Sequence, residues 1–430
     1  MTAPPRSVVI VGGSLAGLMC GIQLKRQGTN VVILEQDSRA ERMSHAAGIS
    51  LGSNIAEFLR RYDDTHTLAG IPSSGSHISR RTWAKLFSVK FERQLTSWGL
   101  LYRILRANLD GLATQPCPNP PAPRPGDGRV EYRAGQRVTG LQYDASASGE
   151  GGKMTVLFED VATGKQDSIT ADLVVGADGI HSTVRRLVQA PVKTGSGYAG
   201  YVVWRGLLPV KSATPETAAF FAEGIAFQTL QRSYMVCYII PTDDGGFGPG
   251  ERLINWVWYF NVADGSREMD EIFTDVHGIK HNNTVPAGLV RSEVWDRCRE
   301  SLTAQMTAPF REIVRRTAEP FVTKVNDVLC TENSFYDGRV VLVGDAFACV
   351  RPHFGLATDH AAFQCLEVMK LWKGEVSREA WRREVMVRSK RLWFLSILLG
   401  RYGLDTWGSF LGTVWAYLVF VVRWKFGWKV

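Results

Sequence analysis

Residues 8–35 hold the feature that most constrains the fold. They read VVIVGGSLAGLMCGIQLKRQGTNVVILE: an apolar strand, a glycine-rich turn, a helix, and a second apolar strand that ends on an acidic residue. Strands without polar alternation are typical of a parallel sheet that is covered on both faces. This order predicts a mononucleotide-binding βαβ unit, and therefore a chain that binds a dinucleotide. An ordinary βαβ crossover without a ligand is the alternative.

Each residue type in this segment has a physical role. Gly12 permits the tight turn, Ser14 is small enough for a pyrophosphate to approach, and Gly17 lets the helix pack closely. Ser14 replaces the middle glycine of the usual pattern, so the strict motif is broken. An acidic residue about 20 positions further on can accept hydrogen bonds from a ribose. The predicted cofactor contacts here are Gly12, Gly13, Ser14, Leu15, Ala16, Gly17, Glu35 and Gln36.

Two later segments identify the dinucleotide. Residues 172–185 read DLVVGADGIHSTVR, and residues 338–362 read GRVVLVGDAFACVRPHFGLATDHAA. Together with the first segment they resemble the three fingerprints of the FAD-dependent class A flavoprotein monooxygenases, the aromatic hydroxylase family. The residues that match the second and third fingerprints are Asp178, Gly179, Ser182, Arg185, Gly344, Asp345, Ala346, Pro352 and Gly355.

The resemblance implies how FAD is held. Asp345 would lie beside the ribityl chain and pyrophosphate and accept hydrogen bonds from the ribityl hydroxyls, although it could also cap a helix. The amides of residues 355–357 would open a helix and stabilise negative charge on the flavin. On the helix expected at 101–109, Arg103 is the first choice for the FAD phosphates and Arg106 the second, with a solvated helix face as the alternative. The other predicted contacts are Arg42, Ala47, Gly48, Val138, Asp178, Gly344, Gly355, Leu356 and Ala357.

Some residues depart from the family's commonest pattern. Ala348 stands in place of a histidine, Ala357 of a glycine, and Asp359 of an asparagine. Three segments are instead similar to the 2,6-dihydroxypyridine 3-monooxygenase branch, namely 351–353 (RPH), 197–206 (GYAGYVVWRG) and 253–259 (LINWVWY).

The resemblance implies a monooxygenase that consumes NADPH or NADH. It would insert one oxygen atom from O₂, through a flavin C4a-hydroperoxide, into a phenol or a hydroxylated N-heteroaromatic ring. The sequence has no second glycine fingerprint, which fits a nicotinamide donor that binds transiently. Two alternatives stay open: epoxidation or a related oxidation of a larger lipophilic alkaloid or terpenoid scaffold, and an FAD-binding protein without oxygenase activity.

The substrate pocket is predicted on strands expected at 200–210 and 252–262. Side chains alternate along a strand, so Asn255 lies on the face opposite to Trp256 and Trp258, and only part of the set can line a pocket. A buried tryptophan is more often core. His353 could orient or deprotonate a phenolic hydroxyl as a catalytic residue, or could be a structural histidine. The predicted substrate contacts are Tyr201, Trp204, Arg205, Asn255, Trp256, Trp258 and Phe354.

The predicted fold class is α/β. A Rossmann-like FAD-binding domain would be interleaved with an α+β substrate domain that contains a mostly antiparallel sheet, followed by C-terminal helices. We expect the FAD domain to comprise residues 1–70, 98–190 and 325–375. The substrate domain would comprise residues 71–97 and 191–324, and residues 376–430 would form an apolar helical segment.

Composition narrows the function classes. The net charge of +8 is dispersed, without the basic stripe that would indicate nucleic-acid binding. The seven cysteines have irregular spacings and form no CxxC pair or Cys/His cluster, which predicts reduced thiols, no metal site and a cytoplasmic protein. Residues 1–6 leave no room for a signal peptide before the first strand. We expect a small-molecule substrate and O₂ as partners, in a monomer or homodimer.

The C-terminus is the candidate for membrane contact. Residues 391–400 (RLWFLSILLG) and 408–422 (GSFLGTVWAYLVFVV) are apolar, and basic and aromatic residues follow them. The longer run falls short of the ~20 residues that cross the hydrocarbon layer. A peripheral, monotopic anchor is one interpretation. The other is a pair of helices that packs on the catalytic part of the chain or on a dimer partner.

Overall fold

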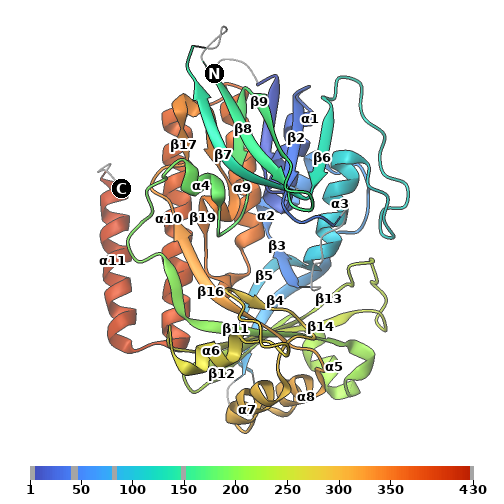
Figure 1. Cartoon of the computed structure of the whole chain (residues 1–430). Coiled ribbons are helices and arrows are strands. Elements are labelled where there is room, and N and C mark those ends of the chain that lie inside the picture. The colour runs from blue at the N-terminus through green and yellow to red at the C-terminus, as the bar shows by residue number, and fades with distance from the viewer. Residues whose placement is uncertain (1–4, 40–46, 80–84, 147–151, 427–430) are drawn as a thin grey trace.

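Three β-sheets organise the chain (Figure 1). The computed structural model describes residues 5–39, 47–79, 85–146 and 152–426. One sheet has the strand order β17-β18-β10-β1-β2-β6, and its neighbouring strands are parallel except for β17 and β18. Its strands are β1 (Ser7–Val11), β2 (Asn30–Glu35), β6 (Val130–Ala134), β10 (Leu173–Gly176), β17 (Ser334–Phe335) and β18 (Val340–Leu342).

The parallel sheet joins distant parts of the chain. The apolar strand β10 lies between β1 and β18, where Val9 pairs with Val174 and Val175 pairs with Val341. All four valines are almost fully buried, as expected for strands that helices cover on both faces. The segments that follow β1, β10 and β18 are the three fingerprints. The sheet therefore brings them to one edge, at the carboxyl ends of the strands.

A larger and mostly antiparallel sheet lies below the parallel one in Figure 1. Its order is β15-β16-β11-β14-β13-β12-β4-β5-β3, with β19 paired to β16 and with β4 parallel to β12. The strands are β3 (Gly48–Leu51), β4 (Ile71–Ser79), β5 (Lys85–Ser97), β11 (Gly197–Pro209), β12 (Ile225–Leu230), β13 (Ser233–Ile240), β14 (Leu253–Asn261), β15 (Thr284–Val285), β16 (Phe321–Leu329) and β19 (Ala348–Cys349). The third sheet consists of β7 (Gln136–Asp144), β8 (Lys153–Asp160) and β9 (Gln166–Ala171).

The helices form three groups in Figure 1. One surrounds the parallel sheet (α1–α4 and α9), one lies under the large sheet (α5–α8), and α10 and α11 run side by side along one flank. The helices are α1 (Leu15–Lys25), α2 (Ser53–Tyr62), α3 (Trp98–Asp110), α4 (Thr183–Leu187), α5 (Pro215–Ala222), α6 (Arg267–Phe273), α7 (Ser292–Thr303), α8 (Ala308–Arg316), α9 (Ala357–Trp372), α10 (Arg378–Leu404) and α11 (Trp407–Lys425). Short 3₁₀ turns are η1 (Val210–Ser212), η2 (Tyr336–Gly338), η3 (Gly344–Ala346) and η4 (Pro352–Phe354).

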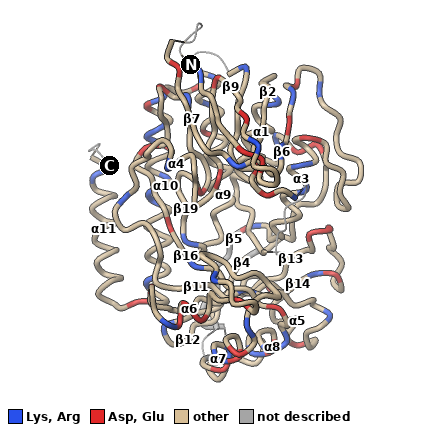
Figure 2. Tube along the Cα trace, viewed as in Figure 1, with Lys and Arg blue, Asp and Glu red and all other residues tan. Residues whose placement is uncertain are grey.

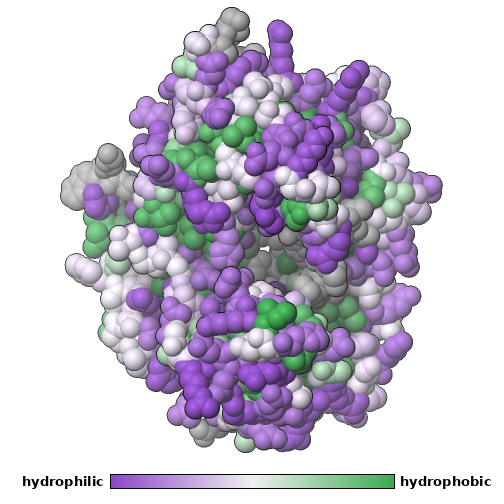
Figure 3. Space-filling model, in the orientation of Figure 1, coloured by the Kyte–Doolittle hydropathy of each residue, from purple (hydrophilic) through white to green (hydrophobic). Residues whose placement is uncertain are grey.

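This architecture confirms the predicted fold class: a Rossmann-like parallel sheet, a largely antiparallel sheet and C-terminal helices. A hollow opens between the upper and lower parts of the molecule in the space-filling view (Figure 3). Because β3 lies within residues 1–70 yet pairs with β5 of the large sheet, strand pairing alone does not fix domain boundaries. The domain division, the compartment and the oligomeric state stay predictions. In the described part of the chain, no helix combines the length and apolarity needed to cross a bilayer.

A buried ion pair fixes the segment before η4. The Arg351 Nε atom donates to Asp327 Oδ2 at 2.6 Å, and the Trp393 indole of α10 donates to Asp327 Oδ1 at 3.0 Å. Asp327 is fully buried and Arg351 nearly so. Burial raises the pKa of Asp327, while Arg351 and Trp393 act in the opposite direction. The network joins β16, the segment before η4, and α10.

Asp327→Asn should lower the free energy of unfolding by about 3–5 kcal/mol, because the buried Arg351 charge loses its carboxylate. Urea denaturation monitored by tryptophan fluorescence measures the loss. The control is the pair of Arg267 and Glu271, in which the arginine side chain is 93% exposed. Arg267→Gln should cost no more than about 1 kcal/mol. Equally small losses in the two variants would show that the buried pair is dispensable.

Candidate functional site

The glycine loop between β1 and α1 is shaped by backbone contacts. Gly12 has a φ of +103°, and a Cβ atom there would lie 2.5 Å from the Ala177 carbonyl oxygen. A Cβ atom on Gly17 would lie 2.0 Å from the Gly12 carbonyl oxygen. Side chains are therefore excluded at both positions. Ser14 is the N-cap of α1 and makes no side-chain capping bond, so its side chain does not occupy the helix amides that could bind an anion at this end.

Glu35 lies at the end of β2 and supports this loop. Its Oε2 atom accepts a hydrogen bond from the Gly13 amide at 2.8 Å, and its Oε1 atom accepts one from the Asp37 amide at 2.9 Å. The side chain is nearly fully buried. This position beside the glycine loop fits the predicted ribose contact, which stays a prediction together with the neighbouring Gln36.

The two candidate arginines of α3 point to different partners. Arg106 is buried, and its guanidinium carbon lies 3.7 Å from the centre of the Tyr132 ring. The Tyr132 hydroxyl donates to the Gly13 carbonyl at 3.3 Å, so Arg106 is linked to the glycine loop. Arg103 instead pairs with Asp244, in the connection between β13 and β14, at 2.7 Å. Of the two, Arg106 is the one that this structure connects to the predicted phosphate site.

The second fingerprint borders the glycine loop through its backbone. Asp178 uses its carboxylate to cap α4, where it accepts hydrogen bonds from the Thr183 and Val184 amides at 2.6 and 3.0 Å. The Cα atom of Asp178 would lie 2.8 Å from a Cβ atom on Gly12. A contact with FAD through the Asp178 backbone fits this arrangement better than one through its carboxylate.

The third fingerprint brings a carboxyl group to the same edge of the sheet. Gly344 has a φ of +60°, and a Cβ atom there would lie 2.8 Å from Ala16 Cβ. Burial raises the pKa of Asp345 to about 6, and a contact with the Cys349 thiol opposes the rise only in part. A half-buried carboxyl group with so little local compensation suits a ligand that brings hydroxyl donors. These residues therefore fit the ribityl part of FAD.

Residues 351–355, the RPHFG segment, meet β3 at the predicted flavin position. Gly355 has a φ of +63°, and its carbonyl accepts a hydrogen bond from Ser50 Oγ at 2.8 Å. Leu356 is the N-cap of α9, which begins at Ala357. Asp359, a departure from the family pattern, caps α2 by accepting hydrogen bonds from the backbone amides of residues 54 and 55. This cap gives the substitution a structural reason that its sequence position did not reveal.

Three predicted substrate contacts need correction. Trp204, Trp256 and Trp258 have no exposed surface, and their rings surround Trp295 of α7 at centroid distances of 5.0, 5.9 and 6.3 Å. This core lies between the large sheet and the helices under it. The indoles face away from the flavin segments because alternate side chains of a strand point to opposite faces. They contribute packing, and truncation of one such side chain costs about 3–5 kcal/mol.

The other face of the large sheet presents polar side chains to β3. Arg205 Nη2 donates to the Gly48 carbonyl at 3.2 Å, and the Gly48 amide donates to Asn255 Oδ1 at 3.1 Å. A Cβ atom on Gly48 would lie 2.8 Å from the Tyr238 ring, so the three side chains enclose this glycine. Burial raises the pKa of Tyr238 to about 12, although the Arg205 charge lowers it. We name Arg205, Tyr238 and Asn255 the polar cluster.

Sequence reasoning missed Tyr238 and Arg93. Arg93 of β5 donates from Nη1 to the Phe354 carbonyl at 2.7 Å, and burial lowers its pKa. No motif marks either residue. Their strands are brought into one sheet by a long-range pairing, because β4, the partner of β5, pairs with β12, the partner of β13. The available signal was strand alternation, which places Tyr238 on the same face as Tyr234 once the strand is known.

His353 lies in a cluster of tyrosines. Its Nε2 atom is 2.6 Å from the Tyr201 hydroxyl, its Nδ1 atom bonds the Tyr234 hydroxyl, and its ring is 4.7 Å from that of Tyr259. A Cβ atom on Gly400 of α10 would lie 2.5 Å from Nε2. Burial holds the pKa of His353 well below its usual range. The expected substrate contact at Tyr201 is therefore corrected to a buried partner of this histidine.

Three further residues predicted to contact FAD are Ala47, Val138 and Arg42. Val138 is buried in β7 opposite Phe158, and the Ala47 carbonyl accepts a hydrogen bond from the Trp98 amide at 2.8 Å. Arg42 lies outside the described residues. The adenine and flavin contacts predicted at these positions stay predictions.

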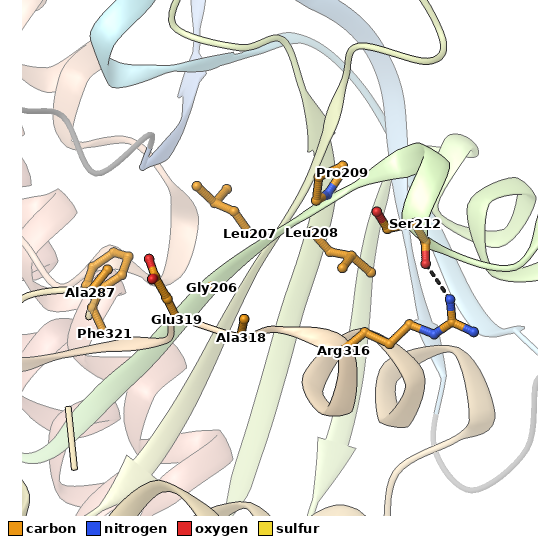
Figure 4. A pocket seen from close by; sticks show the side chains of 10 residues that line it. All are labelled: Gly206, Leu207, Leu208, Pro209, Ser212, Ala287, Arg316, Ala318, Glu319 and Phe321. Atoms are coloured by element: carbon orange, nitrogen blue, oxygen red, sulfur yellow. Dashed lines mark hydrogen bonds between the residues drawn. The ribbon is translucent and has the colours of Figure 1, made fainter. Parts of the chain in front are cut away.

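A pocket of about 750 Å³ lies at the edge of the large sheet (Figure 4). Phe321 lines it, and the ring of this residue is 5.6 Å from the Arg205 guanidinium carbon, so the pocket adjoins the polar cluster. None of its lining residues belongs to the three fingerprints. The lining residues are Gly206, Leu207, Leu208, Pro209, Ser212, Ala287, Arg316, Ala318, Glu319 and Phe321.

Comparison with known proteins agrees with an FAD-binding chain. A family model described as "FAD binding domain" matches residues 6–60, and one described as "FAD binding domain-like" matches residues 198–327. The chain is 27% identical to 2,6-dihydroxypyridine 3-monooxygenase of Paenarthrobacter nicotinovorans, over 80% of this chain and 77% of that protein. It is 24% identical to the FAD-dependent urate hydroxylase of Mycolicibacterium vanbaalenii, over 81% and 75%.

Solved structures show the same fold. The structure of 2,6-dihydroxypyridine-3-hydroxylase from Arthrobacter nicotinovorans superposes with a TM-score of 0.76 at 23% identity, covering 94% of this chain and 95% of that one. A salicylate hydroxylase substrate complex superposes with a TM-score of 0.65 at 16% identity, covering 99% and 96%. The cofactor is FAD, and NAD(P)H is the electron donor typical of such enzymes. The prediction from the three fingerprints is confirmed: the chain is an FAD-dependent monooxygenase that resembles the aromatic hydroxylases.

Proposed function

We propose that this enzyme hydroxylates a phenol or a hydroxylated N-heteroaromatic ring that binds at the polar cluster. The observation that carries the proposal is the position of Arg205 and Asn255. Both side chains contact Gly48, next to the meeting point of β3 and the RPHFG segment. A ring held there would lie beside the segments predicted to contact the flavin.

Arg205 supplies the charge that such a ring needs. Within the described residues, its buried Nε atom has no hydrogen-bond partner. A guanidinium offers neighbouring N–H donors that match an oxygen anion. A positive charge at a few ångströms favours the ionised form of a phenol, which is richer in electrons at the ring carbons than the neutral form. Arg205 would therefore both orient and activate the substrate.

The chain's other residues hold the two reactants together. The glycine loop, Glu35 and Asp345 would bind the nucleotide and ribityl parts of FAD, and the amides of residues 355–357 would face the ring system. Bound FAD supplies the electron transfer and oxygen activation. Asn255 offers an amide to a ring nitrogen or hydroxyl. Placement between packed elements limits water access, which strengthens the hydrogen bonds to the substrate.

We assign a positioning role to His353. Both ring nitrogens bond tyrosine hydroxyls, and its low pKa keeps the ring neutral near physiological pH. A general base has to reach the proton that it removes, and this ring is enclosed by Tyr201, Tyr234 and Tyr259. Its contribution is to hold the RPHFG segment against the large sheet.

Relatives support the substrate class. By their names, two relatives act on 2,6-dihydroxypyridine and on urate, both of which are nitrogen heterocycles. The test is NAD(P)H-dependent turnover under ¹⁸O₂ with a panel of phenols, hydroxypyridines and larger alkaloid or terpenoid scaffolds. One labelled oxygen on a small ring supports the proposal. Labelled product from only the large scaffolds would replace it, and no labelled product from any ligand would contradict it.

Arg205→Gln should lower kcat/KM for the identified substrate by about 30- to 100-fold, equivalent to loss of one charged hydrogen bond. Arg205→Lys should be intermediate, because it keeps the charge but loses the planar donor pair. Arg316→Gln is the matched control, since Arg316 lines the adjoining pocket and bonds Ser212 instead. Similar losses in Arg205→Gln and Arg316→Gln would remove Arg205 from the substrate site.

FAD affinity should depend on the ionisation of Asp345. Hydroxyl donors stabilise the carboxylate, so FAD binding lowers the pKa of Asp345 from about 6 and releases a proton. The Kd for FAD should be constant above about pH 7 and should rise as the pH falls through 6. Asp345→Asn should weaken binding about tenfold and abolish this pH dependence. Titration of apoprotein fluorescence measures both, with exposed Asp167→Asn as control; unchanged behaviour of Asp345→Asn would contradict the assignment.

The pH profile of kcat/KM separates the two interpretations of His353. Because burial holds the His353 pKa well below its usual range, the ring stays neutral around neutral pH, and its titration should not appear in the profile there. His353→Gln should lower the thermal midpoint but keep the shape of the profile. If His353 were a catalytic base, kcat/KM of the wild type would fall at low pH as the ring is protonated. This fall would disappear in His353→Gln, while the thermal midpoint would stay unchanged.

A further inference from the structure

The outward face of α11 exposes large apolar side chains. Six of them follow at intervals of three or four residues, so they share one side of the helix. Their exposed fractions run from 47% to 71%. An apolar surface of this kind on an otherwise folded protein marks an interaction site. The residues of this apolar face are Trp407, Leu411, Trp415, Leu418, Val422 and Phe426.

The opposite side of α11 packs on the body of the protein. Phe420 is buried, with its ring 5.6 Å from that of Phe394 on α10. The Arg401 guanidinium of α10 donates to Thr413 Oγ1 at 2.6 Å. Figure 1 shows α11 as the outermost helix of this flank. The helix is therefore held by α10 on one side, and its apolar face is directed outward.

A cluster of positive charges lies beside the C-terminal end of this face. Lys390 is partly buried, and its pKa is lowered by burial and by the charges of Lys193 and Arg423. Four bases gather here: Lys193, Lys390, Arg423 and Lys425. Within the residues that the structure describes, none of them forms an ion pair with a carboxylate. Helix α11 contains no acidic residue, and Figure 2 shows it as tan with basic positions at its C-terminal end.

We propose that the apolar face of α11 docks on the surface of an anionic phospholipid bilayer. The helix would lie along the interface with its tryptophan, leucine and valine side chains inserted among the upper acyl chains. Indole rings favour this region because they combine an apolar body with a polar N–H group. The basic cluster would meet the phosphate and carboxylate headgroups, which supply the counter-charges that the chain lacks there.

Charge distinguishes a lipid surface from a second copy of this chain. A copy that pairs through α11 would bring two more bases and no acidic residue from that helix. The apolar faces could still pack, but the basic clusters would stay without counter-charges. An anionic bilayer satisfies the apolar face and the basic cluster together. The inference does not depend on the identity of the substrate.

Flotation of the FAD-loaded full chain with lipid vesicles tests the apolar face. Wild type should bind vesicles of phosphatidylcholine mixed with phosphatidylserine, and should bind more weakly to phosphatidylcholine alone or at high salt. Replacing two exposed residues, Leu411→Asp with Trp415→Asp, should reduce binding at least tenfold. Ile279→Asp is the matched control because Ile279 and Leu411 are both 60% exposed. Flavin absorbance of each variant verifies that the fold is retained.

A single charge reversal tests the basic cluster. Arg423→Glu should weaken binding to the anionic vesicles about fivefold or more, since each base near the surface contributes to attraction. Its control, Lys165→Glu, reverses an exposed charge on the connection between β8 and β9 and should leave binding unchanged.

Three outcomes would overturn the proposal. Wild type could fail to float with anionic vesicles, or the double aspartate variant could float as well as wild type. Light scattering could also show a dimer that the double aspartate variant converts to monomer, with no vesicle binding by wild type. That last result would assign the apolar face to a second copy of the chain.

Discussion

The close packing of the glycine loop against the ends of β1 and β10 is the contact on which the rest of the structure depends. Gly12 and Gly17 leave no room for side chains, and Ala177, which contacts the loop, directly follows β10, more than 150 residues further along the chain. Because β10 is inserted between β1 and β18, the segments that follow all three strands meet at one edge. Backbone packing therefore sets the edge of the sheet at which we propose that FAD binds.

The two faces of the large sheet carry different side chains because the side chains of a strand alternate: one face packs the core and the other faces the predicted substrate site. One face carries tryptophans that pack on α7, and the other carries the polar cluster against Gly48. The first face anchors β11 and β14 firmly, so the polar side chains on the second stand on rigid strands. Near η4, the tyrosines around His353 and the pair of Arg351 and Asp327 hold the RPHFG segment in the same way.

The cofactor side could be predicted from sequence because its signals are local: glycines at fixed spacings after apolar strands. The substrate side could be predicted only in part. The alternation of side chains along a strand predicts that Asn255 and Trp256 lie on opposite faces of the sheet. Which of the two faces meets the flavin segments is decided by tertiary packing, which the sequence pattern does not give. Likewise, the partners of His353 and Asp359 lie on other elements, so no local pattern identifies them. The exposed side of α11 also depends on how α10 packs, which an apolar run does not encode by itself.

The most direct test of the account is anaerobic reduction of the bound flavin by NADPH and by NADH, with and without candidate ring substrates, followed by stopped-flow absorbance. The account predicts a yellow protein whose flavin is bleached rapidly when a phenol or hydroxylated N-heteroaromatic ligand is present and slowly without it, because ligand at the polar cluster completes the site. A protein that cannot be reconstituted with FAD, or a bound flavin that no ligand makes reducible, would contradict the account.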